Sequence, residues 1–223
     1  MTIKQFDIDP ANSDDDGIAE AQQPTTSVPF VLNGAMADLG TAGQFDVGNA
    51  YSSGIGGVQV SFTSAGNWSG VTITMVCKDQ DGHAVTEAIT GPNATTVTST
   101  TYVSQILAGG ITVSGTVATN IYSGPADTML TKTIPINIYA NDGATLAVTG
   151  LSGTIQYDTQ ETFSSLLDTV TLAQAANWID VSSNKTTDFV ASASVGASGV
   201  RLKLDSYTDG AELQFAVSQT PFR

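Results

Sequence analysis

The sequence predicts an all-β protein with two small β-sandwich or barrel-like domains, preceded by an extended N-terminal arm. Three observations support this fold class. Apolar and polar residues alternate in short runs along most of the chain, as they do in half-buried strands. Clusters of Gly, Asn and Asp separate the runs at intervals of about ten residues, which is typical of sandwiches and barrels. The 223 residues are enough for two domains that each bury a core.

The arm comprises residues 1–26. It contains six of the chain's acidic residues together with Pro10 and Pro24, and its apolar residues show almost no periodic pattern. Such a segment should not form a core by itself. We expect it either to become ordered against a neighbouring subunit or to be a frayed terminus.

The first domain is predicted over residues 27–124, and its clearest element is a β-hairpin. If Cys77 faces Val85 and Ile73 faces Ile89, the connecting loop must hold an odd number of residues. The segment 80–82, Gln-Asp-Gly, supplies three, and its glycine can adopt the left-handed conformation of a bulged hairpin. Other strands of this domain are expected at 28–33, 44–47, 57–62, 101–107, 111–114 and 119–123.

A linker is predicted at 125–132, where the strand spacing is interrupted, followed by a second β-rich domain at 133–223. In this domain the interval 161–180 is ambiguous, because helical spacing of apolar residues is followed by a β-branched run. We expect a short helix or an elaborate loop there. Strands are expected at 133–140, 144–150, 153–160, 200–207 and 211–218.

The charge balance argues against nucleic acid as a partner. The chain has 21 acidic against 7 basic residues, a formal net charge of −14, and the basic residues are scattered. Phosphate binding needs clustered Lys and Arg. No segment approaches the ~20 consecutive apolar residues of a membrane span, and no signal peptide is recognisable at the N-terminus. We therefore expect no nucleic acid and no membrane among its partners.

The titratable residues do not form a catalytic or metal-binding set. The single histidine, His83, is expected to be exposed at the hairpin tip, whereas the single cysteine, Cys77, should face the core. One Cys and one His cannot complete a tetrahedral zinc site. Asp79 and Asp81 match part of a calcium loop, but the remaining ligands are missing and turn chemistry accounts for both. We therefore predict a non-enzyme with no catalytic, metal-binding or cofactor-binding residues and no cofactor.

Four further features are not interpreted as functional sites. Trp68 and Trp178 are expected to pack at turns or interfaces, because aromatics are too few to furnish a sugar-stacking cleft. The acidic run 14–16 is interpreted as a solvated surface segment, although it could attract a cation or a basic partner. Glu87 is the residue that fits the hairpin register badly, since it would lie opposite Met75.

Four segments resemble structural proteins of tailed bacteriophages. They are DGIAEAQQP at 16–24, LNGA at 32–35, VSFTSAGNWSGVTITMVCKDQDGHAVTEAITGPNATTVTSTTYV at 60–103, and VRLKLDSYTDGAELQFAVSQ at 200–219. The chain departs from the usual pattern at His83, where Asn is common, and at 76–78, where small residues are usual. The resemblance implies a virion protein assembled in the cytoplasm of a bacterial host.

The resemblance is less specific for a position within the virion. Two small β-domains with an extended arm can attach to a symmetric lattice, so we expect a capsid decoration or cement protein that binds the major capsid protein or other virion proteins. Repeated copies on a symmetric lattice would strengthen weak contacts by avidity, so a homo-oligomer is expected, with a trimer favoured. A tail, fibre or head-to-tail connector component is the alternative of the same class. A host-surface carbohydrate-binding module is the alternative from a different class.

Overall fold

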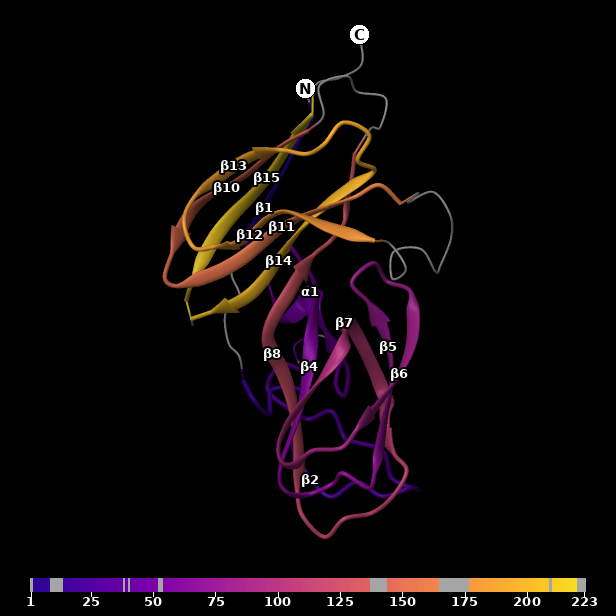
Figure 1. The fold of residues 1–223 in the computed structure, drawn as a ribbon. Coiled ribbons are helices and arrows are strands. Elements are labelled where there is room, and N and C mark those ends of the chain that lie inside the picture. The colour runs from indigo at the N-terminus through magenta and orange to yellow at the C-terminus, as the bar shows by residue number, and fades with distance from the viewer. Residues whose placement is uncertain are drawn as a thin grey trace. The chain divides into compact units, whose positions relative to one another are not determined.

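The structure is a computed structural model that describes residues 2–8, 14–37, 39, 41–51, 54–136, 144–164, 177–208 and 210–219. It confirms the all-β prediction: the described residues form strands and one four-residue helix, α1 (Val47–Ala50) (Figure 1). The side chain of Asp46 caps this helix by accepting a hydrogen bond from the Gly48 N–H.

The chain divides into two compact units that do not follow the predicted domain boundaries. Unit 1 contains Met1–Asn12, Ser52–Ile55 and Thr128–Arg223, and unit 2 contains Ser13–Tyr51 and Gly56–Asp127. Two of the boundaries between the units fall inside strands. These strands are β4 (Ile55–Asn67) and β8 (Ile121–Thr131). The segment predicted as a linker at 125–132 therefore belongs largely to β8. Its Gly-Pro start disrupts the apolar alternation without ending the strand.

Unit 2 is built around long antiparallel strands. Its strand order is β8, β4, β7 (Asn93–Val113), β5 (Thr72–Asp79) and β6 (Ala84–Thr90), with β2 (Ala19–Gln22) beside β8 and β3 (Phe45–Asp46) beside β7. β5 shows why these segments form strands, because its buried residues alternate strictly with exposed or half-buried ones. The large side chains completely buried in this unit include Phe45, Phe62, Trp68, Ile73 and Met75.

The predicted hairpin register is confirmed. In the β5–β6 pair, Cys77 lies opposite Val85 and Ile73 lies opposite Ile89. The strands are joined through 80–82, and Gly82 has a φ of +88°. The Asp79 N–H donates to the His83 carbonyl and closes the loop. Parity of the apolar pattern and loop length were therefore sufficient to predict this element.

β7 is longer than the pattern suggested. Residues 101–107 and 111–113, expected in separate strands, belong to one strand with an irregularity between them. Met75 pairs with Ile111 and Cys77 with Ile106, so β7 has extra residues at this point. Gly109, at a φ of +75°, provides the left-handed conformation that such a bulge uses. The bulge interrupts the alternation while the strand continues.

Unit 1 contains two groups of hydrogen-bonded strands. One is a four-stranded sheet in the order β1 (Thr2–Ile8), β15 (Glu212–Gln219), β10 (Ala144–Ser152) and β13 (Phe189–Ser192). The other has the order β12 (Trp178–Lys185), β11 (Ile155–Thr162), β14 (Gly199–Tyr207) and the end of β8, with β9 (Ile134–Pro135) also paired to β14. Alternate apolar side chains of both groups are buried, among them Leu146, Val148, Leu202, Leu204 and Phe215.

The structure differs from the expected N-terminal arm at two segments. β1 pairs with β15 in an unbroken antiparallel register from Thr2 opposite Gln219 to Ile8 opposite Leu213. Ile8 is only 1% exposed. Farther along, β2 pairs with β8. The local pattern did not reveal β1 because its partner lies more than 200 residues away along the chain.

Three further segments can be compared with their predictions. The segment 28–33 forms no strand; it contributes one isolated bridge between Thr25 and Val28. Of the strand expected at 133–140, only Ile134–Pro135 form a strand, β9, among the described residues, and 137–143 lie outside them. The interval 161–180 begins in β11 and ends in β12. The helix or loop expected between these strands falls largely on 165–176, outside the described residues.

Candidate functional site

The hairpin loop is organised by a buried carboxylate. Asp79 is completely buried, and its Oδ1 accepts hydrogen bonds from the backbone N–H groups of Asp81 and His83 at 3.0 and 2.8 Å. The His83 Nδ1 lies 3.4 Å from the other carboxylate oxygen of Asp79, and the His83 side chain is 29% exposed. His83 is therefore held against the loop and is less exposed than predicted. The two acids serve turn geometry, as expected.

Cys77 has the character of a core thiol. It is 5% exposed. Burial, with smaller contributions from the negative charges of Glu87 and Asp79, raises its pKa to about 12. A thiol with that pKa stays protonated at neutral pH and is a poor nucleophile and metal ligand. This environment gives Cys77 a packing role.

Glu87, which fitted the predicted register badly, has a specific role at a second irregularity of β7. The register between β4 and β7 shifts between the pairs Gln59–Tyr102 and Ser61–Thr98, which leaves extra residues in β7. The Glu87 carboxylate accepts hydrogen bonds from the backbone N–H groups of Thr100 and Thr101, at 2.7 and 3.0 Å. Burial alone would raise the pKa of Glu87, but these hydrogen bonds lower it below its usual value. Glu87 thus satisfies backbone donors at a bulge.

The two tryptophans lie in different environments. Trp68 is completely buried, which removes it as a surface for ligand stacking. Trp178, on β12, is half-buried, and the Arg201 guanidinium lies 3.9 Å from the centre of its ring. The Nε of Arg201 donates to Gln160 at 2.8 Å, and the amide of Gln160 donates to Asp180 at 2.9 Å. Trp178 therefore belongs to a polar network across β12, β11 and β14.

This network continues along β11 through charged groups. Asp158 accepts a hydrogen bond from the Asn184 N–H at 2.7 Å, and one of its oxygens lies 3.5 Å from the Lys203 Nζ. Lys203 also pairs with Asp205, its neighbour two residues along β14. Burial raises the pKa of Asp205, although Lys203 opposes this effect. One lysine thus lies between two carboxylates, and all three residues belong to unit 1.

The acidic run at 14–16 contributes to a turn. The Asp14 carbonyl accepts a hydrogen bond from the Gly17 N–H at 2.9 Å. A side-chain hydrogen bond from Asp14, followed by burial and the charges of Asp14 and Glu20, raises the pKa of Asp16. Crowded carboxylates of this kind disfavour one another's ionisation. Within the described parts of the chain, no group of three His, Cys, Asp or Glu side chains could hold a metal ion.

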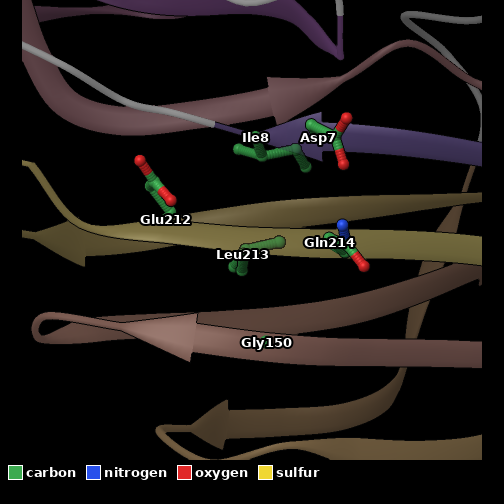
Figure 2. A pocket seen from close by; sticks show the side chains of 6 residues that line it. All are labelled: Asp7, Ile8, Gly150, Glu212, Leu213 and Gln214. Atoms are coloured by element: carbon green, nitrogen blue, oxygen red, sulfur yellow. The ribbon is translucent and has the colours of Figure 1, made fainter.

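A pocket of about 460 Å³ opens on the four-stranded sheet of unit 1 (Figure 2). We call it the acidic dish. Its lining residues come from β1, β10 and β15, and they are Asp7, Ile8, Gly150, Glu212, Leu213 and Gln214. It is a candidate binding site, because it combines a concave surface with carboxylates held on paired strands.

Strand alternation explains the polarity of the dish. Asp7 lies opposite Gln214, and Ile8 lies opposite Leu213, so the polar pair and the apolar pair point to opposite faces of the sheet. Asp7, Glu212 and Gln214 are exposed, whereas Ile8 and Leu213 are each 1% exposed. Figure 2 shows Asp7 beside Gln214, with Glu212 farther along the same strand.

A bulge in β10 forms the third side of the dish. The register between β10 and β15 shifts between the pairs Thr149–Gln214 and Ser152–Glu212. Gly150, in this irregularity, has a φ of +69° and no side chain to fill the space beside Gln214. The absence of a side chain at Gly150 therefore helps to keep the dish open.

The two carboxylates of the dish are available to a ligand. Among the described residues, neither Asp7 nor Glu212 has an ion pair or a side-chain hydrogen bond. The sequence pattern does not bring them together, because Asp7 and Glu212 lie more than 200 positions apart along the chain. A glycine within the predicted strand at 144–150 was the one local signal of an irregular sheet.

Comparison with known proteins adds no assignment. No protein-family model, no curated protein and no solved structure matches this chain. No helix among the described residues combines the length and apolar character needed to cross a membrane.

Proposed function

We propose that this chain is a non-enzymatic structural protein of a tailed-bacteriophage virion, and that it acts as a capsid decoration or cement protein. The observation that carries the proposal is the resemblance of residues 60–103 and 200–219 to such proteins. In this role the protein would bind the major capsid protein as a homo-oligomer, with a trimer favoured. Many weak, symmetric contacts would then add to strong attachment by avidity.

The local structure of these segments supports the proposal. Residues 60–103 include the β5–β6 hairpin with its three-residue loop, and residues 200–219 include the antiparallel strands β14 and β15. The departures from the phage pattern lie at the hairpin, where Cys77 is buried and His83 packs against Asp79. They alter local packing and leave the three-residue loop intact.

The surface composition is also suited to a protein used in many copies. Only 13% of residues are charged, and hydroxyl-bearing and small residues are abundant. Strands exposed on one face are then covered by short side chains, which lose little conformational entropy when a neighbouring molecule packs on them. Contacts on such faces need few salt bridges.

Copy number in purified virions tests the proposal. The chain would be quantified by mass spectrometry with isotope-labelled peptides, relative to the major capsid protein of the same particles. Decoration of a symmetric capsid predicts on the order of hundreds of copies, whereas a connector or fibre predicts about six to twelve. Absence from the particles would contradict both positions in the virion.

Deletion of residues 1–26 is not a clean test of attachment, because it would remove the paired strands β1 and β2. Binding of the full chain to capsids that lack it is therefore the better assay. Saturable binding with a fixed ratio to the major capsid protein is expected. Binding confined to isolated tails would instead favour the tail or connector alternative.

A second candidate, carbohydrate binding, rests on one observation. Trp178 is half-buried against the Arg201 guanidinium, and Arg201 is linked through Gln160 to Asp180, so a partly exposed aromatic ring lies next to a polar network. A glycan array would test it with the full chain and the Trp178→Ala variant. Defined hits that disappear in the variant would favour this function over the structural one.

A further inference from the structure

We propose that Lys203 and Asp158 form an intramolecular isopeptide bond, with Asp205 as the group that transfers the protons. Asp158 on β11 lies directly opposite Lys203 on β14, and Asp205 follows two residues later on β14. Strand alternation places all three side chains on the same face of this strand pair. The reaction needs no ligand and no second protein, so it is independent of the role proposed above.

The structure holds the lysine amine beside its target. The Lys203 Nζ lies 3.5 Å from the Oδ2 of Asp158, and it also pairs with the Oδ1 of Asp205. Reacting groups held about 3–3.5 Å apart have a high effective concentration, provided that their support is rigid. Here the support is the β11–β14 pair, whose antiparallel register is unbroken over residues 157–162 of β11. The two groups are therefore already close in the folded chain.

The carboxyl group of Asp158 is shielded from water and polarised on one side. The Asp158 side chain is 10% exposed, and its Oδ1 accepts a hydrogen bond from the Asn184 N–H at 2.7 Å. Asn184 has a φ of +54° and lies at the irregularity between β11 and β12. A backbone N–H directed at one oxygen stabilises the negative charge that develops there during attack on the carbon. Asn184 thus provides an oxyanion donor, while the Oδ2 of Asp158 faces the lysine.

Asp205 has the environment of a proton-transfer group. One of its oxygens pairs with Lys203. The other, Oδ2, is buried and has no hydrogen-bond partner among the described residues. Burial raises the pKa of Asp205, Lys203 opposes this effect, and the negative charge of Asp158 adds to it. A carboxyl group in contact with the reacting amine can accept a proton and later return it.

The reaction is a condensation that releases one water. The Lys203 ammonium gives one proton to Asp205, and the resulting amine attacks the side-chain carbonyl carbon of Asp158. A carbon–nitrogen bond forms, the nitrogen loses a second proton, and the bond from the carbon to Oδ2 breaks. The departing oxygen takes both protons, delivered through Asp205, and leaves as water. Asp205 ends as a carboxylate again, the product is an amide, and nothing is oxidised or reduced.

Intact-mass spectrometry of the full chain tests the proposal. The unaltered chain should be lighter than its calculated mass by one water. K203R should have its calculated mass, because arginine keeps the charge but stays protonated and cannot attack. Trypsin cleaves after Lys132, Lys185 and Arg201, so the cross-linked chain should yield one species that joins 133–185 to 202–223. Within this species Lys203 should resist cleavage, because its amine is acylated.

K185R is the matched control. The Lys185 amine lies 4.9 Å from the centre of the Phe189 ring, so this variant should lose the same water as the unaltered chain. In D205N, the mass loss that follows a short pulse of synthesis should be on the order of a hundredfold slower, the size of a general acid–base contribution. Circular dichroism would show that K203R and D205N remain folded.

Three results would overturn the cross-link. The first is an unaltered chain that stays at its calculated mass, with trypsin cleaving after Lys203. The second is a water loss that persists in K203R. The third is a water loss that maps to Asp81–Gly82 or Asp209–Gly210, since succinimide formation at an Asp-Gly pair also releases water. Equal rates in D205N and the unaltered chain would overturn the role of Asp205.

Discussion

At the residue scale, Gly82 offers a direct test of the hairpin geometry. Its φ is +88°, and a Cβ placed there would meet no heavy atom within 4 Å, so Gly82→Ala would introduce backbone strain without a clash. Gly70 is the matched control, because its surroundings are equally open and its φ is not positive. We expect Gly82→Ala to lower the free energy of unfolding by about 1 kcal/mol. Gly70→Ala should be neutral or slightly stabilising.

Urea denaturation of both variants provides the measurement for this pair. Equal midpoints would show that the left-handed conformation at Gly82 is not required. The difference between the two variants measures the free-energy cost of the left-handed backbone conformation, because neither substitution adds a buried contact.

Glu87 gives a pH-dependent prediction at the same scale. Its carboxylate bonds the N–H groups of Thr100 and Thr101, and its pKa is lowered in the folded protein. A lowered pKa means that the unfolded chain binds the proton more tightly, so this contribution is present above the ordinary pKa of glutamate and is lost as the pH falls through the folded value. Glu87→Gln should therefore reduce stability at pH 7 by about 1 kcal/mol, since half-exposure weakens the charged hydrogen bonds.

The variant and the unaltered chain should then converge in stability as the pH falls through the lowered pKa that Glu87 has in the folded protein. Denaturant midpoints at several pH values measure this convergence. Asp127→Asn serves as the control, because Asp127 is an exposed acid of the same unit and its side chain makes no hydrogen bond with the described residues. A difference for Glu87→Gln that stays constant with pH would contradict the assigned role.

At the scale of elements, a substitution in β1 can test whether this segment is a strand of the folded unit or an arm that is ordered only on a neighbouring molecule. Ile8 is 1% exposed and lies opposite Leu213, whereas Gln5 is exposed on the same strand. Ile8→Ala should destabilise unit 1 by about 2–4 kcal/mol, because it removes buried methyl groups and leaves a cavity. Gln5→Ala should change stability by less than about 0.5 kcal/mol. An arm that becomes ordered only on a neighbouring molecule would instead leave Ile8→Ala neutral in the isolated chain.

The elements also show what sequence can predict. The β5–β6 hairpin was predictable because its partners, loop and register lie within one short segment, where period-two alternation fixes the faces. The sequence pattern predicted two separate strands where β7 is continuous, because the bulge at Gly109 resembles a turn in the local pattern. β1 was missed because pairing between residues 2–8 and 213–219 depends on the fold of the whole unit.

The same reasoning applies to the candidate site. Asp7 stood out in the sequence only as part of an acidic N-terminal segment, and Glu212 only as part of a closing strand. Their proximity follows from the pairing of β1 with β15, a contact between distant parts of the chain. Conversely, Glu87 did signal its role, because a charged residue on an apolar face of a predicted strand needs a polar partner.

At the scale of the whole molecule, the chain path links the two units. Unit 1 is assembled from three separate stretches of sequence and unit 2 from two. The boundaries after Ile55 and after Asp127 fall within β4 and β8. Both units therefore contain residues of β4 and of β8. Independent unfolding would require β4 and β8 to be ordered in one part and disordered in the adjoining part.

We therefore expect the two units to unfold in one cooperative transition. Ile8→Ala, in unit 1, and Phe62→Ala, in unit 2, both remove completely or almost completely buried side chains. In calorimetry each variant should lower the midpoint of the same single transition, with the calorimetric and van't Hoff enthalpies in agreement. Two transitions, of which each variant shifts only one, would show instead that the units are energetically independent. In that case β4 and β8 would only connect two separate domains. The segment 125–132 would then act as the predicted linker, although most of it forms part of strand β8.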